Sequence, residues 1–418
     1  MFNEMNKTLK KPFITYKYME EDIFTQLILK SNERQKESRI YTNQRYLYPQ
    51  LENKKSKYFI GIYGLRGIGK TILLLQLANN YKDGLYFSAD AQYLKKYTLY
   101  EIINFAIKKN YKNIFVDEIT SKPEWKQDLK TTYDENINKK INITFTSSSS
   151  INLIKGADLS RRVILYNLKI ASFREYLNIK KNQKIDSINL KEILSEETRK
   201  SLCLSLGKYE KHLNEYYRYG GLLYNEPENT DYYKSLENII KKIIYNDLSH
   251  LRNINVKIEN DIYNILFLIS TSQPFELNYT RLAKNIGMNK NTLISLVTDI
   301  EKTGLIKLLR NCSEGYKFIR SEPKIFLNIP FRFLLNYTIN KDTKLGSIRE
   351  DFFVSATEPD CSIKVNKNIK TPDFKKGKYT FEVGSKNKKN KQKADYLVLD
   401  ALLFEENKIP LFLFGFLY

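Results

Sequence analysis

The sequence predicts an α/β protein with a parallel sheet in its first half and helical and mixed α+β modules in its second. A glycine-rich loop over residues 64–71 lies between a short apolar run and an apolar helix pattern. Further apolar runs over 84–90, 113–118 and 141–146 alternate with helical stretches, as in repeated βαβ units. At 418 residues with 42% hydrophobic content, the chain is expected to fold into about two or three packed domains.

The loop fits the phosphate-binding pattern G-x-x-x-x-G-K-[ST] without a departure. Its residues are Gly64, Leu65, Arg66, Gly67, Ile68, Gly69, Lys70 and Thr71. Such glycines let several backbone N–H groups point at phosphate oxygens, and the helix that follows adds positive potential. Lys70 is expected to reach the β- and γ-phosphates, and Thr71 to bind Mg²⁺. The sequence therefore predicts a site for ATP and Mg²⁺.

Two acids, Asp117 and Glu118, end the apolar run over residues 113–118. In a βαβ series with a phosphate-binding loop, the first acid of such a pair is placed in the Mg²⁺ coordination sphere. The second acid is then suited to orient or deprotonate the attacking water. An exposed acidic pair is the competing interpretation, but its place after the loop favours ATP hydrolysis.

Hydroxyl and guanidinium groups after the next strand, 141–146, are candidates for contact with the γ-phosphate. Thr146 or Ser148 is expected to sense that phosphate, because open α/β sheets bind ligands at the carboxyl ends of their strands. A serine-rich turn that caps a helix near residue 151 is an equal alternative. Arg161 or Arg162 is a candidate arginine finger, in cis or for a neighbouring subunit, and a solvated loop is its equal alternative.

Two later segments carry a family resemblance. Residues 163–177 include Ala171-Ser172-Phe173-Arg174-Glu175-Tyr176-Leu177, and residues 216–223 include Gly220-Gly221. They resemble the L-x-P-L-S-F-x-E-[FY]-L and Y-x-x-x-G-G-[LF]-P segments of a prokaryotic AAA+-like ATPase family. That family usually has G-R at the arginine pair, which makes Arg162 the better finger candidate. Both family prolines are replaced here, and the family's T-G-S-[SN] is Thr-Ser-Ser-Ser, which loosens the sensor assignment.

The resemblance runs from about residue 40 to the end of the sequence. Members of the family carry a winged helix and a poorly understood C-terminal domain. The architecture that this implies is a helical segment over 1–40, an ATPase core over 41–180, a helical lid over 181–255, a winged helix over 256–330 and a restriction-endonuclease-like domain over 331–418.

The predicted winged helix rests on two helices with a glycine turn between them. They span residues 279–287 and 289–301, and a hairpin of 305–309 with 316–319 supplies the wing. The candidates for DNA contact are Lys284 of the first helix and, at the front of the second, Lys290 and Asn291. Many winged helices bind proteins instead, and that alternative stays open.

The C-terminal region resembles the P-D…[DE]-x-K core of nucleases, in which two carboxylates hold Mg²⁺. The matching acids are Asp373 and Glu382, with Glu350 as a third. Gly384 stands where the lysine belongs, so we expect a vestigial metal site and no cleavage unless Lys386 reaches in.

The charge balance predicts a polyanionic partner. The chain has 69 Lys and Arg against 47 Asp and Glu, a net charge of +22, and eight lysines between residues 375 and 393. Such a patch favours DNA, although a basic surface without a ligand remains the alternative. The cysteines, Cys203, Cys312 and Cys361, follow no spacing of a zinc site or a disulfide framework. We expect a cytoplasmic protein without membrane segments, because no long apolar stretch occurs.

These observations predict an ATP-hydrolysing protein whose nucleotide state controls its binding to DNA. Two alternatives remain from the sequence: an ATP-gated switch for protein interactions with little turnover, and an ATP-dependent, Mg²⁺-dependent nuclease. Assembly into a homo-oligomer is compatible with all three.

Overall fold

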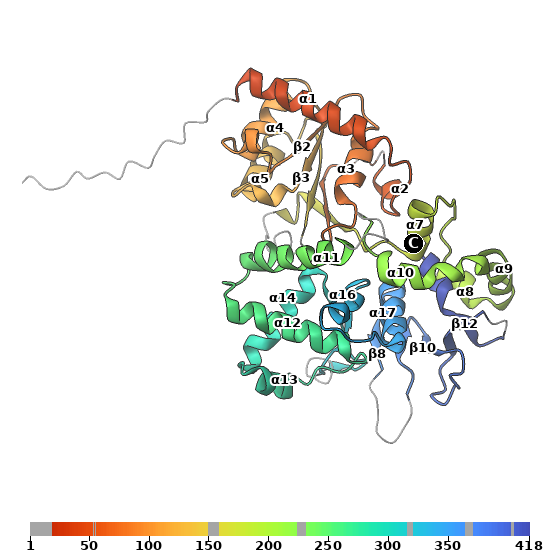
Figure 1. Cartoon of the computed structure of the whole chain (residues 1–418). Helices are drawn as coiled ribbons and strands as arrows, with labels where there is room; N and C mark the ends of the chain where they lie inside the picture. Colours follow the sequence, from red (N-terminus) through yellow and green to blue (C-terminus); the bar gives the residue numbers. More distant parts are fainter. Residues whose placement is uncertain are drawn as a thin grey trace, which may run out of the picture.

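The structure is a computed structural model with three groups of elements. It describes residues 19–52, 54, 56–148, 159–223, 231–315, 321–363, 371–402 and 405–418. Figure 1 shows a parallel sheet with its helices in red to yellow, a helical group in green beneath it, and a mixed group in blue. One cluster of buried side chains includes Leu73, Ile265 and Phe353, one from each group. The three groups therefore share a continuous core.

The first group is built on a five-stranded sheet in the order β2-β3-β4-β1-β5, with every neighbouring pair parallel. Apolar residues of β3 such as Ile114 and Val116 are fully buried, because helices cover both faces. The carboxyl ends of all the strands meet at one edge, where such sheets bind ligands. The predicted parallel sheet is confirmed. Its strands are β1 (Phe59–Tyr63), β2 (Gly84–Ser88), β3 (Asn113–Asp117), β4 (Asn142–Ser147) and β5 (Val163–Asn167).

Helices α1 (Glu21–Ser38), α3 (Lys70–Ala78), α4 (Leu99–Lys108) and α5 (Trp125–Glu135) pack against this sheet, with the short elements α2 (Tyr48–Leu51), η1 (Gln92–Leu94) and η2 (Ile119–Ser121). A capping box starts α4: Thr98 Oγ1 accepts the Glu101 N–H at 3.1 Å, and the Glu101 carboxylate accepts the Thr98 N–H at 2.8 Å. The predicted N-terminal helix corresponds to α1, and residues 1–18 lie outside the described residues, as does the helix predicted near 151.

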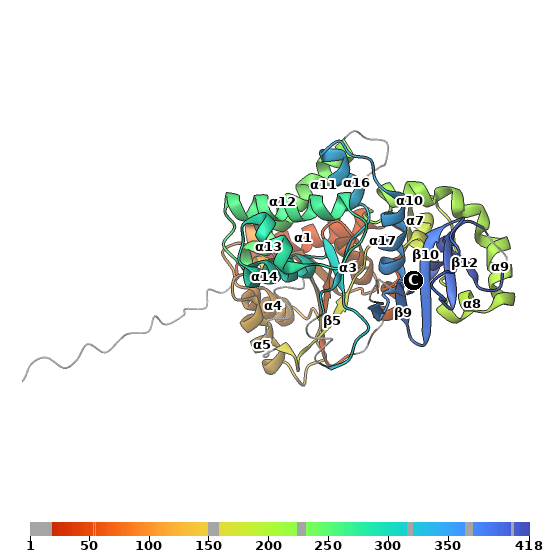
Figure 2. The ribbon, with the colours of Figure 1, turned by 90° about the horizontal axis from the view of Figure 1, so that it is seen from below.

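The predicted lid is divided between two places. Helix α7 (Phe173–Lys180) ends the predicted core. The helices of the predicted lid are α8 (Leu190–Leu194), α9 (Glu196–Leu206), α10 (Leu213–Tyr219) and α11 (Asp231–Lys242), with η4 (Gly207–His212), η5 (Ile243–Asp247) and η6 (Leu248–His250). In Figures 1 and 2, α8 and α9 lie beside the C-terminal sheet, whereas α11 lies under the first group. Buried Arg199 of α9 donates to the carbonyl of Glu406. Packing of the whole lid on the nucleotide domain was therefore a wrong expectation, because α8 and α9 cover a different sheet.

The helix-turn-helix elements are α12 (Val256–Thr271), α13 (Tyr279–Ile286) and α14 (Lys290–Thr303), and Gly287 in the left-handed region (φ 71°) ends α13. The strand β6 (Ile306–Leu309) pairs antiparallel with β7 (Lys324–Leu327). In the described residues the strand opposite β6 is β7. The predicted partner strand over 316–319 lies outside the described residues.

The C-terminal group has a mixed sheet in the order β12-β11-β10-β9-β8. Strands β10, β11 and β12 are parallel, and β9 is antiparallel to both β8 and β10. Its last strand ends at Pro410, and a buried 3₁₀ helix follows. The elements are α16 (Phe331–Thr338), α17 (Leu345–Thr357), β8 (Cys361–Ser362), β9 (Phe374–Lys376), β10 (Tyr379–Ser385), β11 (Tyr396–Asp400), β12 (Lys408–Pro410) and η7 (Leu411–Phe416).

A disulfide joins Cys312, just after β6, to Cys361 of β8, with the Cα atoms 5.1 Å apart. The sequence had argued against a disulfide, because spacing rules do not cover two cysteines separated by 49 residues. Packing of the β6–β7 pair beside the C-terminal group brings the two cysteines together. Among the described residues, no helix combines the length and the apolar composition needed to span a bilayer.

Candidate nucleotide-binding site

The glycine-rich loop leaves β1 and enters α3 at the carboxyl edge of the sheet. Gly64 has φ 154°, and a Cβ there would collide with the carbonyl of Leu168. Gly69 caps α3 with φ 92°, a conformation that side-chain-bearing residues rarely adopt. The backbone of the loop therefore requires glycine at these positions. The loop ends at the N-terminus of α3, where the helix dipole is positive.

Lys70 is folded back into the loop. Its ammonium donates to the carbonyls of Gly64 at 2.9 Å and Leu65 at 3.0 Å, and the residue is only 6% exposed. Burial lowers the pKa of Lys70, while the carboxylates of Glu118 and Asp117 act in the opposite direction. The loop carbonyls thus hold the Lys70 ammonium inside the curve of the loop.

Thr71 and Asp117 meet as the sequence predicts for a Mg²⁺ site. The Thr71 hydroxyl donates to Asp117 Oδ2 at 2.8 Å, and the Tyr86 hydroxyl donates to the same oxygen at 3.1 Å. Thr146 donates to Asp117 Oδ1. A hydroxyl and a carboxylate side by side, next to a phosphate-binding loop, fit the oxygen ligands that Mg²⁺ prefers.

Glu118 follows β3 in a left-handed conformation, φ 49°. Its N–H donates to Thr146 Oγ1 at 3.0 Å, and its Oε2 accepts from the Ser148 hydroxyl at 3.0 Å. Burial raises the pKa of Glu118, with Lys70 and the Ser148 hydrogen bond opposing the rise. The hydroxyls of Thr146 and Ser148 therefore position the two acids, and burial gives the Glu118 carboxylate an increased proton affinity.

Replacement of Ser148 by alanine is expected to move the acidic limb of ATP hydrolysis to higher pH. The hydroxyl lowers the Glu118 pKa, so its loss raises that pKa further, and a base is inactivated as pH falls through its pKa. The measurement is turnover at saturating ATP against pH. Ser88→Ala is the matched control, because the Ser88 hydroxyl faces Asp90 at 2.5 Å. Coincident profiles for both variants would show that Ser148 does not tune Glu118.

Arg162 lies far from this edge. It precedes β5, and Val163 is paired with Phe59 at the amino end of the sheet. Its guanidinium makes two 2.8 Å hydrogen bonds to Asp134 of α5. Because β5 begins at the sheet edge opposite the loop, Arg162 does not reach the loop of its own chain, and the prediction of a finger in cis is wrong. A role of Arg162 toward a neighbouring subunit stays a prediction.

Two arginines hold the loop in place: Arg45, which the sequence did not single out, and Arg66, which it predicted only as a member of the loop. Buried Arg45 donates to the carbonyl of Ile68 and pairs with Glu175, whose Oε1 lies 2.9 Å from Arg45 Nε. Arg66 of the loop makes hydrogen bonds of 2.9 and 3.2 Å to Asp247 of η5. The S-F-x-E segment contains Glu175, but its partner Arg45 lies 130 residues earlier, so the sequence did not reveal the pair.

A cavity of about 1040 Å³ opens above the loop. Its walls include Lys70, Thr71 and Glu118 from the sheet edge, the segment 40–43, and Asn238 and Lys242 of α11. The volume is of the size that encloses a small-molecule ligand. Helix α11 thus forms the part of the predicted lid that faces the loop.

Residues 56–177 match the family described as AAA domain. With the strand order above, this match confirms the predicted P-loop fold of AAA+-like ATPases for the first group. Residues 210–328 match a family described as Domain of unknown function (DUF8612). The match runs from η4 to just past β7, across the predicted boundary at 255.

Two curated proteins of Methanocaldococcus jannaschii, both described as uncharacterized, are similar to this chain. The first is 29% identical over 341 residues, covering 73% of this chain and 70% of the relative. The second is 26% identical over 302 residues, covering 69% of this chain and 64% of the relative. The chain thus spans about two thirds of the length of these relatives.

Solved structures that resemble the chain include the Aeropyrum pernix Orc1 protein in complex with DNA, at 12% identity and a TM-score of 0.27 over 78% of this chain and 93% of that one. A variant of RuvB from Thermotoga maritima follows at 13% identity and a TM-score of 0.25, over 71% of this chain and 90% of that one.

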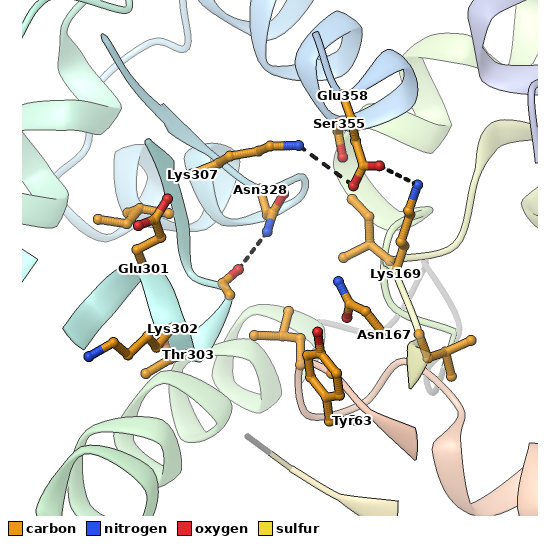
Figure 3. A pocket seen from close by; sticks show the side chains of 16 residues that line it. Tyr63, Asn167, Lys169, Glu301, Lys302, Thr303, Lys307, Asn328, Ser355 and Glu358 are labelled. Carbon is orange, nitrogen blue, oxygen red and sulfur yellow. Dashed lines mark hydrogen bonds and ion pairs between the residues drawn. The ribbon is translucent and has the colours of Figure 1, made fainter. Parts of the chain in front are cut away.

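A second cavity, of about 280 Å³, lies behind the loop of the AAA domain (Figure 3). Lys169, which follows β5, pairs with Glu358 at 2.7 Å, and Lys307 of β6 approaches the same carboxylate at 3.7 Å. Burial raises the pKa of Glu358, but the two lysines outweigh it and hold it below its ordinary value. Glu358, which caps α17, therefore links that helix to the segment after β5 and to β6 beside the loop.

The predicted nuclease acids come together with two lysines, and we call the five residues the acid–lysine cluster. Lys324 Nζ lies 2.6 Å from Glu350 and 4.0 Å from Asp373, and Lys388 Nζ lies 2.5 Å from Glu382. A Cβ on Gly384 would lie 2.6 Å from Lys388 Cγ. The cation near Glu382 is thus Lys388, not the expected Lys386, and its stem occupies the space over Gly384.

These acids do not form a ready metal site in the structure. Among the described residues, no group of three or more acidic, histidine or cysteine side chains is arranged to hold a metal ion. In this conformation Glu350, Asp373 and Glu382 therefore do not form the predicted metal site. Their carboxylates are paired with lysine ammonium groups instead.

Proposed function

We propose that this chain is an ATPase that uses Mg²⁺, and that its nucleotide state controls its grip on DNA. The observation that carries the ATPase is the contact of Thr71 with Asp117 beside Glu118, under a cavity that the glycine-rich loop enters. The comparison with the AAA domain family supports the same activity.

The roles follow from where the side chains lie. Lys70 and the loop N–H groups would bind the β- and γ-phosphates, and Thr71 and Asp117 would hold Mg²⁺, which neutralises phosphate charge. Glu118 would take a proton from the attacking water, a task for which its raised pKa suits it.

A chain of ion pairs supports coupling between the loop and the helix-turn-helix. Arg66 binds Asp247 at the end of η5, and the chain then runs through η6 to Arg252. Arg252 pairs with Asp299 of α14 at 2.5 Å and donates to Ser295 at 3.1 Å. A shift of the loop on nucleotide binding would therefore reach the helix that carries exposed Lys290 and Asn291.

Exposed lysines support a nucleic-acid partner. In the hairpin and loop around β10, the exposed ones are Lys375, Lys378, Lys386, Lys389, Lys391 and Lys393. Ammonium groups on one segment neutralise phosphates without reading sequence, so binding is expected to weaken steeply as salt rises.

Asp247→Asn is expected to uncouple DNA affinity from nucleotide. In the natural sequence, ATP should change affinity for a duplex oligonucleotide by about 5–150-fold, the range of ordinary coupling energies. The amide keeps the shape but loses the charge that holds Arg66, so the ratio should fall toward one while ATP still binds. Fluorescence anisotropy with and without ATP measures both states.

Glu237→Gln is the matched control, because Glu237 pairs only with neighbouring Lys241 in the described contacts and lies outside the proposed route. If ATP changes the DNA affinity of Asp247→Asn as much as that of the natural sequence, the Arg66–Asp247 pair does not couple the two sites. Phosphate release measured in the same samples, with single- and double-stranded DNA, tests the ATPase itself. If no sample releases phosphate, the chain is not an ATPase, and the alternative of a nucleotide-gated switch with little turnover is favoured.

A further inference from the structure

Among the described residues, three hydroxyl groups donate to the carboxylate of Asp117. Thr71 donates to Oδ2 at 2.8 Å from the start of α3, and Thr146 donates to Oδ1 from β4. The third donor is Tyr86 of β2, which reaches Oδ2 at 3.1 Å. Thr71 and Thr146 lie in the segments that predicted the nucleotide site, whereas Tyr86 lies in none of them. The hydroxyl of Tyr86 therefore has a partner but no assigned function.

The register of the sheet explains how Tyr86 reaches Asp117. Strands β2 and β3 pair in parallel, with Tyr86 beside Phe115 and Ser88 beside Asp117. Side chains two residues apart on a strand point to the same face, so Phe115 and Asp117 share the face of Tyr86. Ser88 stands directly beside Asp117, but its hydroxyl donates to Asp90 at 2.5 Å. The longer side chain one pair earlier therefore supplies the hydroxyl.

Tyr86 is held firmly in this position. It is 4% exposed and lies in the same core cluster as Leu74 of α3. Its backbone N–H donates to the hydroxyl oxygen of Ser31 in α1 at 2.9 Å. In the described contacts Asp117 is the acceptor for its phenol O–H, and a buried donor that turned away would lose its partner at a cost. The Tyr86 hydroxyl is therefore a fixed donor to Asp117.

We propose that Tyr86 is a positioning residue for Mg²⁺: its hydroxyl keeps the Asp117 carboxylate turned toward Thr71. The inference rests on the proposed function, in which Thr71 and Asp117 hold the ion. Among the described residues, Thr71 lines the cavity above the loop and Tyr86 does not, so Tyr86 acts through the carboxylate alone. Groups that orient a metal ligand in this way typically contribute about 10–100-fold to metal affinity or activity.

The test is the affinity of the full chain for Mn²⁺ with ADP bound, measured from free Mn²⁺ by electron paramagnetic resonance. Protein is kept in excess over ADP, and no hydrolysis is needed. Tyr86→Phe removes the hydroxyl and keeps the ring, so we expect its Mn²⁺ dissociation constant to rise by about 10–100-fold. Affinity for a fluorescent ADP analogue without metal should stay unchanged, because Lys70 and the loop N–H groups are untouched.

Tyr48→Phe is the matched control. Tyr48 is also 4% exposed, and its hydroxyl donates to Asn80 Oδ1 at 2.9 Å, past the far end of α3. Loss of this buried hydroxyl should leave Mn²⁺ affinity at the natural value. Circular dichroism checks the fold of both variants.

Phosphate release against Mg²⁺ concentration gives a second readout. In Tyr86→Phe the Mg²⁺ concentration for half-maximal turnover should rise by a similar factor, and turnover should recover in excess Mg²⁺. Equal Mn²⁺ affinity in Tyr86→Phe and Tyr48→Phe would overturn the proposal, as would a matching loss of ADP affinity without metal, which would make Tyr86 a support of the loop. If the natural chain itself binds no Mn²⁺ with ADP, the Mg²⁺ site of the proposed function fails as well.

Discussion

Replacement of Glu118 by glutamine is expected to lower the turnover of ATP by about 10²–10⁴-fold, the contribution usual for a positioned general base. Glutamine keeps the size of the side chain and can still accept from Ser148, whose hydroxyl lies 3.0 Å from Glu118 Oε2. It cannot take a proton at neutral pH. ATP affinity should change little, because Lys70 and the loop N–H groups are untouched.

Phosphate release at saturating ATP and binding of a fluorescent ATP analogue measure the two quantities separately. Glu124→Gln is the matched control, since Glu124 is an exposed acid at the start of α5, a few residues past the same strand. Full turnover in Glu118→Gln would assign water activation to another group. Loss of both turnover and nucleotide affinity would make Glu118 a support of the loop instead of a base.

Replacement of Glu175 by alanine is expected to destabilise the AAA domain by about 3–5 kcal/mol, the cost of leaving a buried charge without its partner. Arg45 and Glu175 are 4% and 1% exposed. Glu175 also caps α7, accepting the Ser172 N–H at 3.0 Å. ATP affinity should fall as well, because Arg45 holds the carbonyl of Ile68 inside the glycine-rich loop.

Urea unfolding followed by tryptophan fluorescence measures this loss of stability. The chain has one tryptophan, and Trp125 is 5% exposed in the AAA domain, so its signal reports on that domain. The control is Glu101→Ala, which removes the glutamate of a comparable capping box in α4 without touching a buried arginine. Its expected cost is about 0.3–1.5 kcal/mol. An equal loss in both variants would show that the buried pair contributes little.

The helix-turn-helix and the nuclease-like acids show how far local pattern reaches. The spacing of apolar residues and the glycine at 287 predicted α13 and α14 closely. The strand that pairs with β6 in the described residues is β7, which lies further along the chain than the hairpin pattern placed it. Acids, hairpin and missing lysine were visible in the sequence, but the choice of Lys388 depends on a turn that folds back over Gly384.

The sequence alone determined the phosphate-binding loop, the acids at 117 and 118, and the parallel sheet around them. Each of these features is encoded by residues close together in sequence. The loop needs glycines at fixed spacing, and the acids follow directly after an apolar strand. Tertiary structure alone decided the partners of Arg45 and Arg66, the exclusion of Arg162 from the site of its own chain, the disulfide, and Lys324 among the acids. Each of these joins residues far apart in sequence, or depends on strand direction and on how three groups of elements pack.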